Sequence, residues 1–455
     1  MEIIEEWIVA GSNLVWGMPL LILLSGGGLF FMLYSRFLPF KYFGHALAIL
    51  RGKYDDPDDP GQISHFQALS GALAATIGMG NISGVALAIV AGGPGAIFWM
   101  WVSAFVGIAT KFFTCSLAVL FRGKDSEGNT QGGPMYVIRE GLGKKWMPLA
   151  IFFSVAGFFG STPVFQANQL VASIKGVMFT ETSVDNSFGL DLTLGLIIAT
   201  LVAIVILGGI KRIGIVASRL VPAMVVLYVI SVSIILLMNA GEIFPSLALI
   251  VEDAFTAQAV LGGAVGAIII EGGKRAAFSN EAGIGMAPMM HGAAKTKEPV
   301  REGLVAMLEP VFDTLIVCTM TGLCIIITGV WKADVANGIE LTAMAFNDQL
   351  PGFGKIILVI CVSIFAITTI FGMSYYGMKC LSFLIGAKYG KYFNYWYLFL
   401  VILGAVATLD IVVNLVFIAY GLMAIPTMVS AILLAPKVMQ AAKKYFGDMR
   451  NAQVE

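Results

Sequence analysis

Eleven apolar segments, each close to the length of a membrane-spanning helix, limit what this chain can fold into. Inside a bilayer every backbone N–H and C=O group needs a partner within the protein, so apolar runs of about 20 residues cross it as helices. Charged residues make up 12% of the chain, against about 25% in soluble domains. The sequence therefore predicts an all-α polytopic membrane protein with eleven transmembrane helices, at residues 14–36, 65–91, 94–121, 147–178, 190–210, 215–239, 258–292, 301–330, 352–384, 394–411 and 414–436.

Lysine and arginine residues are concentrated in alternate loops between these segments. If the N-terminus lies outside the cell, nearly all the basic clusters face the cytoplasm, as the positive-inside rule requires. We therefore predict a multi-pass protein of the cell membrane, with the N-terminus outside and the C-terminus in the cytoplasm. The longest polar stretches, 37–64 and 122–146, are expected to be short loops.

Two of the apolar segments are interrupted by glycine and polar residues. The first interruption is Thr76-Ile77-Gly78-Met79-Gly80-Asn81, and the second is Phe278-Ser279-Asn280-Glu281-Ala282-Gly283-Ile284-Gly285. Glycine in a helix interior costs about 1 kcal/mol relative to alanine. A broken helix survives at membrane depth only where it faces protein or a water-filled cavity. Paired breaks in the two halves of a polytopic chain point to the binding site of a secondary transporter.

The spacing of the breaks divides the chain into repeats. If the first segment is counted as an extra span, five spans follow from each break, and the odd number makes the second group enter the membrane from the opposite side. We expect an inverted 5+5 repeat whose helices 1 and 6 are discontinuous. The predicted parts are an N-terminal span with a cytoplasmic loop (1–64), the first repeat (65–239), the second repeat (258–436) and a cytoplasmic tail (437–455).

At these breaks the chain resembles the LeuT-fold transporters, and it is most similar to the alanine or glycine:cation symporter family. Closer similarity to that family comes from Gln131-Gly132-Gly133-Pro134-Met135-Tyr136 and from Ser279-Asn280-Glu281-Ala282-Gly283. The resemblance implies sodium-driven import of glycine and alanine by alternating access. It also implies that Phe278 forms a wall of the substrate pocket.

An amino-acid zwitterion needs donors for its carboxylate and acceptors for its ammonium, and an unwound helix supplies both from its backbone. The predicted substrate-binding residues are Thr76, Gly78, Met79, Gly80, Phe165, Gln166, Phe278, Asn280 and Ile284. Two structural alternatives remain open. The glycines could instead allow close helix packing, and the amides near Pro163 could only satisfy backbone groups freed by the kink.

For sodium, the resemblance implies a site made of two carbonyls from span 1 and one carbonyl and two hydroxyls from span 8. The matching residues are Ala74 and Ile77, then Phe365, Thr368 and Thr369. The alternative is that each threonine bonds a carbonyl of its own helix, as helical threonines commonly do. A second cation site near Thr76 and Asn81 is also conceivable.

Proton coupling is the rival mechanism, because Glu281 lies in the second break and can carry a proton instead. The middle of span 5 holds no ionisable side chain except Tyr228. This near absence of ionisable groups favours sodium coupling over proton coupling. Lys111 is expected to pair with an acid from span 6 or span 7. Glu271 and Arg275 are spaced as an i, i+4 ion pair.

Other classes of function find little support. The five cysteines lie in apolar runs without CxxC spacing, and the three histidines are too scattered for a metal site. We therefore expect that the protein is not an enzyme and binds no nucleic acid. We expect a monomer in contact with membrane lipid, which carries a small amino acid as substrate and sodium as the co-transported ion. A transporter of another small solute on the same fold is the second reading.

Overall fold

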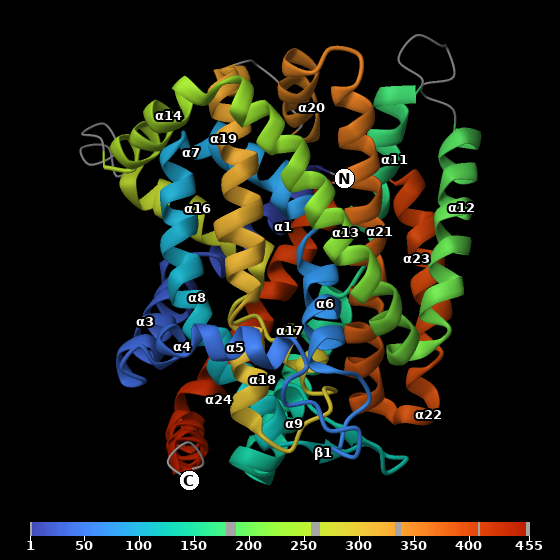
Figure 1. Cartoon of the computed structure of the whole chain (residues 1–455). Coiled ribbons are helices and arrows are strands. Elements are labelled where there is room, and N and C mark those ends of the chain that lie inside the picture. The colour runs from blue at the N-terminus through green and yellow to red at the C-terminus, as the bar shows by residue number, and fades with distance from the viewer. Residues whose placement is uncertain (1, 179–187, 256–263, 333–337, 408–409, 452–455) are drawn as a thin grey trace.

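The computed structural model describes residues 2–178, 188–255, 264–332, 338–407 and 410–451, which form an almost entirely helical molecule (Figure 1). The β-structure among these residues is an antiparallel ribbon of two short strands and an isolated parallel bridge between Ile63 and Ala294. The elements of the first half are α1 (Glu2–Val15), α2 (Met18–Leu21), η1 (Ile22–Gly26), α3 (Gly27–Tyr34), α4 (Leu38–Lys41), α5 (Phe43–Leu50), α6 (His65–Thr76), η2 (Gly80–Gly84), α7 (Val85–Gly92), α8 (Gly95–Leu120), β1 (Gly123–Lys124), β2 (Thr130–Gln131), α9 (Pro134–Tyr136), η3 (Val137–Leu142), η4 (Lys144–Trp146), α10 (Met147–Gly160), α11 (Val164–Met178), α12 (Phe188–Ile206), α13 (Gly209–Met238) and α14 (Ala240–Asp253).

The second half repeats the pattern of long helices joined by short ones. Its elements are α16 (Ala264–Asn280), α17 (Ala287–His291), α18 (Pro299–Ala306), η5 (Val311–Cys318), α19 (Thr319–Thr328), η6 (Val330–Lys332), α20 (Gly338–Gln349), α21 (Gly354–Ile385), α22 (Ala387–Gly390), α23 (Phe393–Val406) and α24 (Asp410–Asn451). The helices of spans 1, 2, 6 and 7 pack on one another, as α8 does on α16 and α18. Those of spans 3, 4, 8 and 9 form a second group, in which α12 packs on α23 and α10 on α21.

Among the described residues, eight helices are long and apolar enough to cross a membrane, and the bent pair of α6 with η2–α7 makes nine. Two predicted spans do not qualify. Segment 258–292 is interrupted at Glu281, and its first residues lie outside the described part of the chain. In segment 394–411 the helix α23 has only 14 residues. A polytopic membrane protein is confirmed, whereas the count of eleven spans stays a prediction.

Both predicted interruptions are breaks in the helices. The first half-helix, α6, starts at Ser64, whose side chain forms a capping box with Gln67, and the chain resumes as a helix at Gly80, bent by 56°. The second break separates α16 from α17. There Glu281 has a left-handed φ of 54°, a conformation that costs about 1–2 kcal/mol for a residue with a side chain. Strain of this kind persists where the surrounding structure imposes it, often at functional sites.

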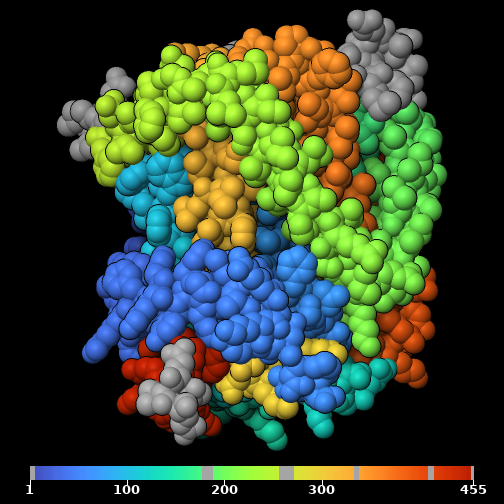
Figure 2. Space-filling model, viewed as in Figure 1, coloured from blue at the N-terminus to red at the C-terminus, as the bar shows by residue number. Residues whose placement is uncertain are grey.

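Several segments expected to be loops or tails are helical. Residues 37–64 contain α4 and α5, which lie across the lower face in Figure 2. Helix α24 passes the predicted end of the last span at residue 436 and continues to Asn451. The sequence reading was wrong here because it counted only segments apolar enough to span lipid, and such helices are partly polar.

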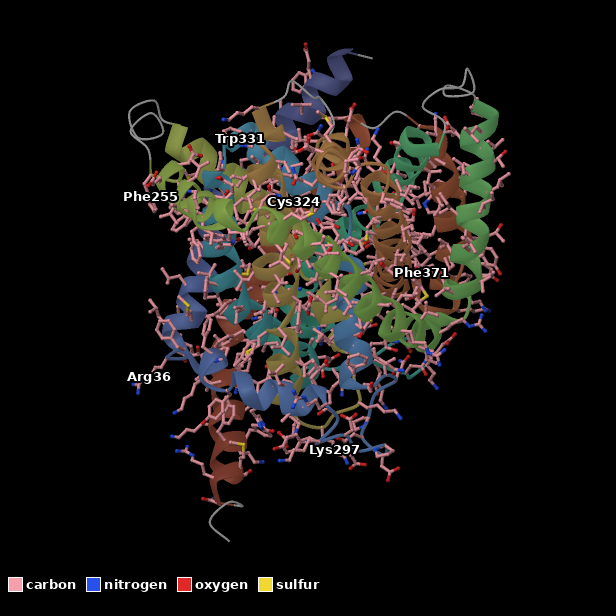
Figure 3. All side chains as sticks on the ribbon, turned by 45° about the horizontal axis from the view of Figure 1, so that its top comes forward. Arg36, Phe255, Lys297, Cys324, Trp331 and Phe371 are labelled. Carbon is pink, nitrogen blue, oxygen red and sulfur yellow. The ribbon has the colours of Figure 1, made fainter. Side chains whose placement is uncertain are left out.

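The basic loops gather at one end of the molecule. Arg122 donates to the carbonyls of Pro60, Gly292 and Thr296, so three loops far apart in sequence meet there. Figure 3 shows Arg36 and Lys297 toward this end, from which α24 projects, and Trp331 near the opposite end. The segments predicted to lie on one side of the membrane therefore do share one end.

Large apolar side chains cover much of the outer surface of the long helices. Leu201, Ile204 and Leu237 are among those that are exposed, while the polar side chains of both breaks are buried. Apolar surface of this extent is what contact with lipid requires. All five cysteines are buried and unpaired, as expected.

Candidate transport site at the two helix breaks

The two breaks lie against each other and against α21. A methyl group at Gly80 would lie 3.2 Å from the ring of Phe278, and one at Gly78 would overlap Thr369 Oγ1. These two glycines therefore allow the close approach of three helices that a larger residue would prevent.

The first break is held by Asn81. Its Oδ1 accepts the N–H of Gly78 at 3.0 Å, and its Nδ2 donates to the carboxylate of Asp313 at 2.7 Å. The expectation that the Gly78 N–H binds the substrate carboxylate is therefore not met in this conformation, because the side chain of Asn81 already uses it. Met79 and Gly80 remain for that role. The Thr76 hydroxyl donates to the Ala72 carbonyl of its own helix at 3.2 Å.

The second break is held by η5. Asn280 Nδ2 donates to Thr314 Oγ1 at 3.0 Å, and Asn280 Oδ1 accepts the N–H of Ala282. Ser279 donates to Asp313 at 2.6 Å, so this one buried carboxylate joins both breaks. Sequence reasoning missed Asp313 and Thr314 as part of the site, because only the fold brings span 7 between the breaks.

An aromatic cluster covers the second break. The ring of Phe278 lies 6.0 Å from Phe165 of α11 and 4.8 Å and 5.6 Å from Phe417 and Tyr420 of α24, measured between ring centroids. Phe165 and Phe278 therefore do come together as predicted. Phe417 and Tyr420 were not predicted, since aromatic residues in an apolar span give no sign of which way they face.

Two further predicted residues are buried. Gln166 is buried, and its Oε1 has no hydrogen-bond partner among the described residues. Ile284 is buried after the break, and its carbonyl accepts a hydrogen bond from Thr427 of α24 at 3.0 Å. Gln166 therefore has an unused buried acceptor, while the backbone of Ile284 anchors the break to α24.

The predicted sodium ligands of α6 and α21 also meet. Thr369 Oγ1 lies 3.5 Å from the Ile77 carbonyl oxygen and donates to the Phe365 carbonyl at 2.9 Å. Thr368 Oγ1 lies 3.0 Å from the same Phe365 carbonyl and 2.9 Å from that of Ile364. Both threonines therefore bond carbonyls of their own helix, as the alternative expected. Ala74 is fully buried in α6, one turn before Ile77. These buried, uncharged oxygens suit a hard monovalent cation.

A second, unpredicted feature is a buried array of charged side chains next to the site. Lys111 pairs with Glu309 of span 7 at 2.6 Å, as expected for this lysine. His291 lies 2.7 Å from Glu309 and 2.5 Å from Glu302, and His65 also contacts Glu302. His65 and His291, which the sequence predicts to be too scattered for a metal site, are joined across the fold by Glu302. The predicted i, i+4 pair Glu271–Arg275 is confirmed at 2.5 Å and is partly buried.

One group in this array has the residue types of a metal site. Ligand atoms of Cys115, His291 and Glu309 lie within 4.8 Å of one another. However, both ring nitrogens of His291 already face carboxylates, and the ammonium of Lys111 is hydrogen-bonded to Glu309. A metal ion bound here would have to replace a proton of His291 and would lie beside the positive charge of Lys111. The group therefore fits a hydrogen-bonded array better than a metal site.

Comparisons with known proteins show what the whole chain is similar to. Residues 1–455 match the sequence model of the sodium:alanine symporter family. The chain is 41% identical over 449 residues to the sodium/alanine symporter AgcS of Methanococcus maripaludis, covering 98% of this chain and 97% of that protein. It is 33% identical over 446 residues to the probable sodium/glutamine symporter GlnT of Bacillus subtilis, covering 98% and 91%. The crystal structure of MhsT in complex with L-phenylalanine shares the fold, with a TM-score of 0.58 at 15% identity over 82% of this chain and 89% of MhsT.

Proposed function

This chain belongs to the sodium:alanine symporter family, and we propose that it imports glycine and alanine together with sodium by alternating access. Membership makes it a multi-pass transporter for amino acids coupled to a cation, and not an enzyme. The choice of substrate, the ion site and the direction of transport are the parts that we propose.

The contact between Thr369 and the end of the first half-helix carries the proposal for sodium. In α6 the carbonyl of Ile77 faces span 8 because the helix ends there, and the absent side chain of Gly78 lets Thr369 approach. A cation bound between them would hold the break against α21. Sodium binding would in this way set the shape of the substrate site beside it.

The surroundings of Phe278 favour a small substrate. Three aromatic rings from α11 and α24 lie around it, and Gly80 faces it with no room for a side chain. We place the substrate carboxylate at the N–H groups of Met79 and Gly80, and its ammonium at the carbonyls of residues 278–280. Beyond the carboxylate and the ammonium, glycine has no side chain and alanine has only a methyl group. The longer side chain of glutamine would have to displace an aromatic ring.

Two cavities at opposite ends of α21 are candidate entrances. One, of about 330 Å³, is lined by Ser173, Glu340 and Lys355, among others. The other, of about 150 Å³, is lined by Gln62, Asp125 and Lys379, among others. Lys355 and Lys379 are 24 positions apart on one helix, which corresponds to about 36 Å. Substrate would enter through the first cavity and leave through the second.

Binding of radiolabelled glycine and L-alanine to the purified protein tests this proposal, with sodium or with choline in its place. We expect binding in sodium only, competition by unlabelled glycine and alanine, and weak competition by glutamine. Thr369→Ala should weaken the sodium dependence, while Thr200→Ala on the exposed face of α12 serves as the matched control. Binding that is equal in choline would contradict the sodium site, and stronger competition by glutamine would contradict the substrate.

A further inference from the structure

The buried array extends from the second helix break toward the end of the molecule where the basic loops meet. Its members come from three stretches of the chain, and each is 0–1% exposed: His65 (α6), Lys111 (α8), and the neighbouring His291 (α17), Glu302 (α18) and Glu309 (next to η5). Each neighbouring pair is joined by a hydrogen bond. Five ionisable groups buried in one connected row exceed what packing of the bundle requires, since buried ion pairs contribute little to stability on balance.

The hydrogen bonds fix where the protons of this row are. His291 Nδ1 faces Glu302 Oε1 at 2.5 Å, and His291 Nε2 faces Glu309 Oε1 at 2.7 Å. When Glu302 and Glu309 are both ionised they only accept, so both ring nitrogens donate and His291 is an imidazolium. His65 Nδ1 contacts Glu302 Oε2 and donates in the same way.

Both ends of the row carry a buried atom with an unused lone pair. His65 Nε2 has no hydrogen-bond partner within the described part of the chain. At the other end, Glu281 lies within electrostatic range of Lys111, and its Oε2 is likewise buried without a partner among those residues. Buried polar atoms are normally paired, so two unpaired acceptors at the two ends need an explanation.

The charges of the row and Glu281 do not balance. Lys111 and the His291 imidazolium supply two positive charges, while Glu309, Glu302 and an ionised Glu281 supply three negative ones. A net negative charge on these five buried groups is costly, and one more proton removes it from them. The nearby carboxylate of Asp313 is stabilised separately, by hydrogen bonds that Asn81, Ser279 and Thr314 donate to it. The unpaired atoms are the two places where that proton can bind.

We propose that the row and Glu281 together form a binding site for one exchangeable proton, held either on Glu281 Oε2 or on His65 Nε2. This rests on the proposed function, because Glu281 directly follows Asn280 of the substrate site. When sodium and the amino-acid ammonium bind beside Glu281, their positive charge favours the ionised carboxylate. The proton then leaves Glu281 for solvent, and no other bond changes.

The other ionisable groups around the two ends are compatible with this exchange. Around Glu281 they are Lys111, Glu309, Asp313, Tyr376 and Tyr420, and around His65 they are Glu302, Asp55 and Arg301. Tyr420 Oη donates to Glu281 Oε1 at 3.3 Å, which leaves Oε2 free to take the proton. The hydroxyl of Tyr376 is also buried and unpaired among the described residues.

Proton release on ligand binding tests the proposal directly. Sodium, and then sodium with L-alanine, is added to purified full-length protein in weakly buffered detergent solution containing a pH-sensitive dye, from mildly acidic to mildly alkaline pH. We expect release of up to one proton per bound ligand, with a maximum at intermediate pH. Glu281→Gln should abolish the release while alanine still binds, whereas Glu271→Gln on the same helix α16 should leave it unchanged.

Three results would overturn the proposal: no release from the wild-type protein at any pH, full release from Glu281→Gln, or loss of release in Glu271→Gln. If Glu281→Gln does not fold, His65→Gln replaces it, and its release should then peak at a different pH from that of the wild type. Failure of the proposed function gives a different result, namely no sodium-dependent binding of glycine or alanine. In that case the proton released on addition of sodium alone is still measured.

Discussion

Thr369 Oγ1 lies 3.5 Å from the carbonyl oxygen of Ile77, although the two residues are separated by 292 positions in the chain. The hydroxyl comes from an intact helix and the carbonyl from the end of a broken one. This contact joins the helices of spans 1, 2, 6 and 7, which include both breaks, to those of spans 3, 4, 8 and 9, which do not. A cation bound here would therefore act on the relative position of the two groups of helices.

Gly78→Ala should reduce sodium-dependent binding of alanine by about 5- to 150-fold. The added methyl group would overlap Thr369 Oγ1, and overpacking of this kind costs about 1–3 kcal/mol. Gly84→Ala is the matched control, since a methyl group there meets no atom within 4 Å and Gly84 belongs to the same broken span. Titration of bound alanine against sodium for both variants measures the effect. Equal sodium dependence in the two would show that the approach of Thr369 is unimportant.

Asn280→Ala should weaken substrate binding by about 5- to 30-fold, as the loss of its two buried hydrogen bonds costs about 1–2 kcal/mol in the geometry of the break. Asn239→Ala, at the end of α13 and remote from the breaks, should bind alanine as the wild type does. Equilibrium binding at saturating sodium compares them. Wild-type affinity in Asn280→Ala would remove this residue from the site.

Phe165→Ala should widen the substrate specificity. The truncation removes one of the rings packed against Phe278 and leaves room beside the break. We expect glutamine to compete with labelled alanine at least tenfold better than in the wild type, with a smaller change for glycine. Phe159→Ala on the lipid-facing side of α10 is the control. Unchanged competition by glutamine would mean that this wall does not limit substrate size.

Lys111→Met should lower the thermal stability of the purified protein strongly, because removing one partner of a buried ion pair typically costs about 3–5 kcal/mol. The double variant Lys111→Met with Glu309→Gln should recover part of the loss, since no uncompensated charge then remains between Lys111 and Glu309. Thermal unfolding of both variants, followed by the tryptophan fluorescence, measures this. A double variant less stable than the single one would contradict the pairing.

Nine of the eleven predicted spans and both breaks agree with the structure, because each is encoded locally. Apolar length identifies a spanning helix, and glycine with asparagine or serine at membrane depth identifies Gly78–Asn81 and Ser279–Gly285 as interruptions. The meeting of Phe165 with Phe278, and of Thr369 with Ile77, was expected only through the family resemblance. Neither follows from the spacing of the residues.

Contacts between remote polar residues could not be predicted. Asp313 contacts Asn81 across 232 positions, and His65 contacts Glu302 across 237. In the sequence each is a single polar residue within or beside an apolar run, with no periodic pattern to indicate its partner. For Lys111 the need for a partner could be predicted from the cost of burying a charge, but its identity came from the fold.

Uptake of radiolabelled alanine into proteoliposomes containing the purified protein tests the central claim most directly. An inward sodium gradient is imposed in one set, equal sodium on both sides in a second, and Thr369→Ala protein under the gradient in a third. Sodium-coupled transport through this site predicts accumulation of alanine above its external concentration only in the first set, with little or none for Thr369→Ala. Accumulation without a sodium gradient, or undiminished accumulation by Thr369→Ala, would contradict it.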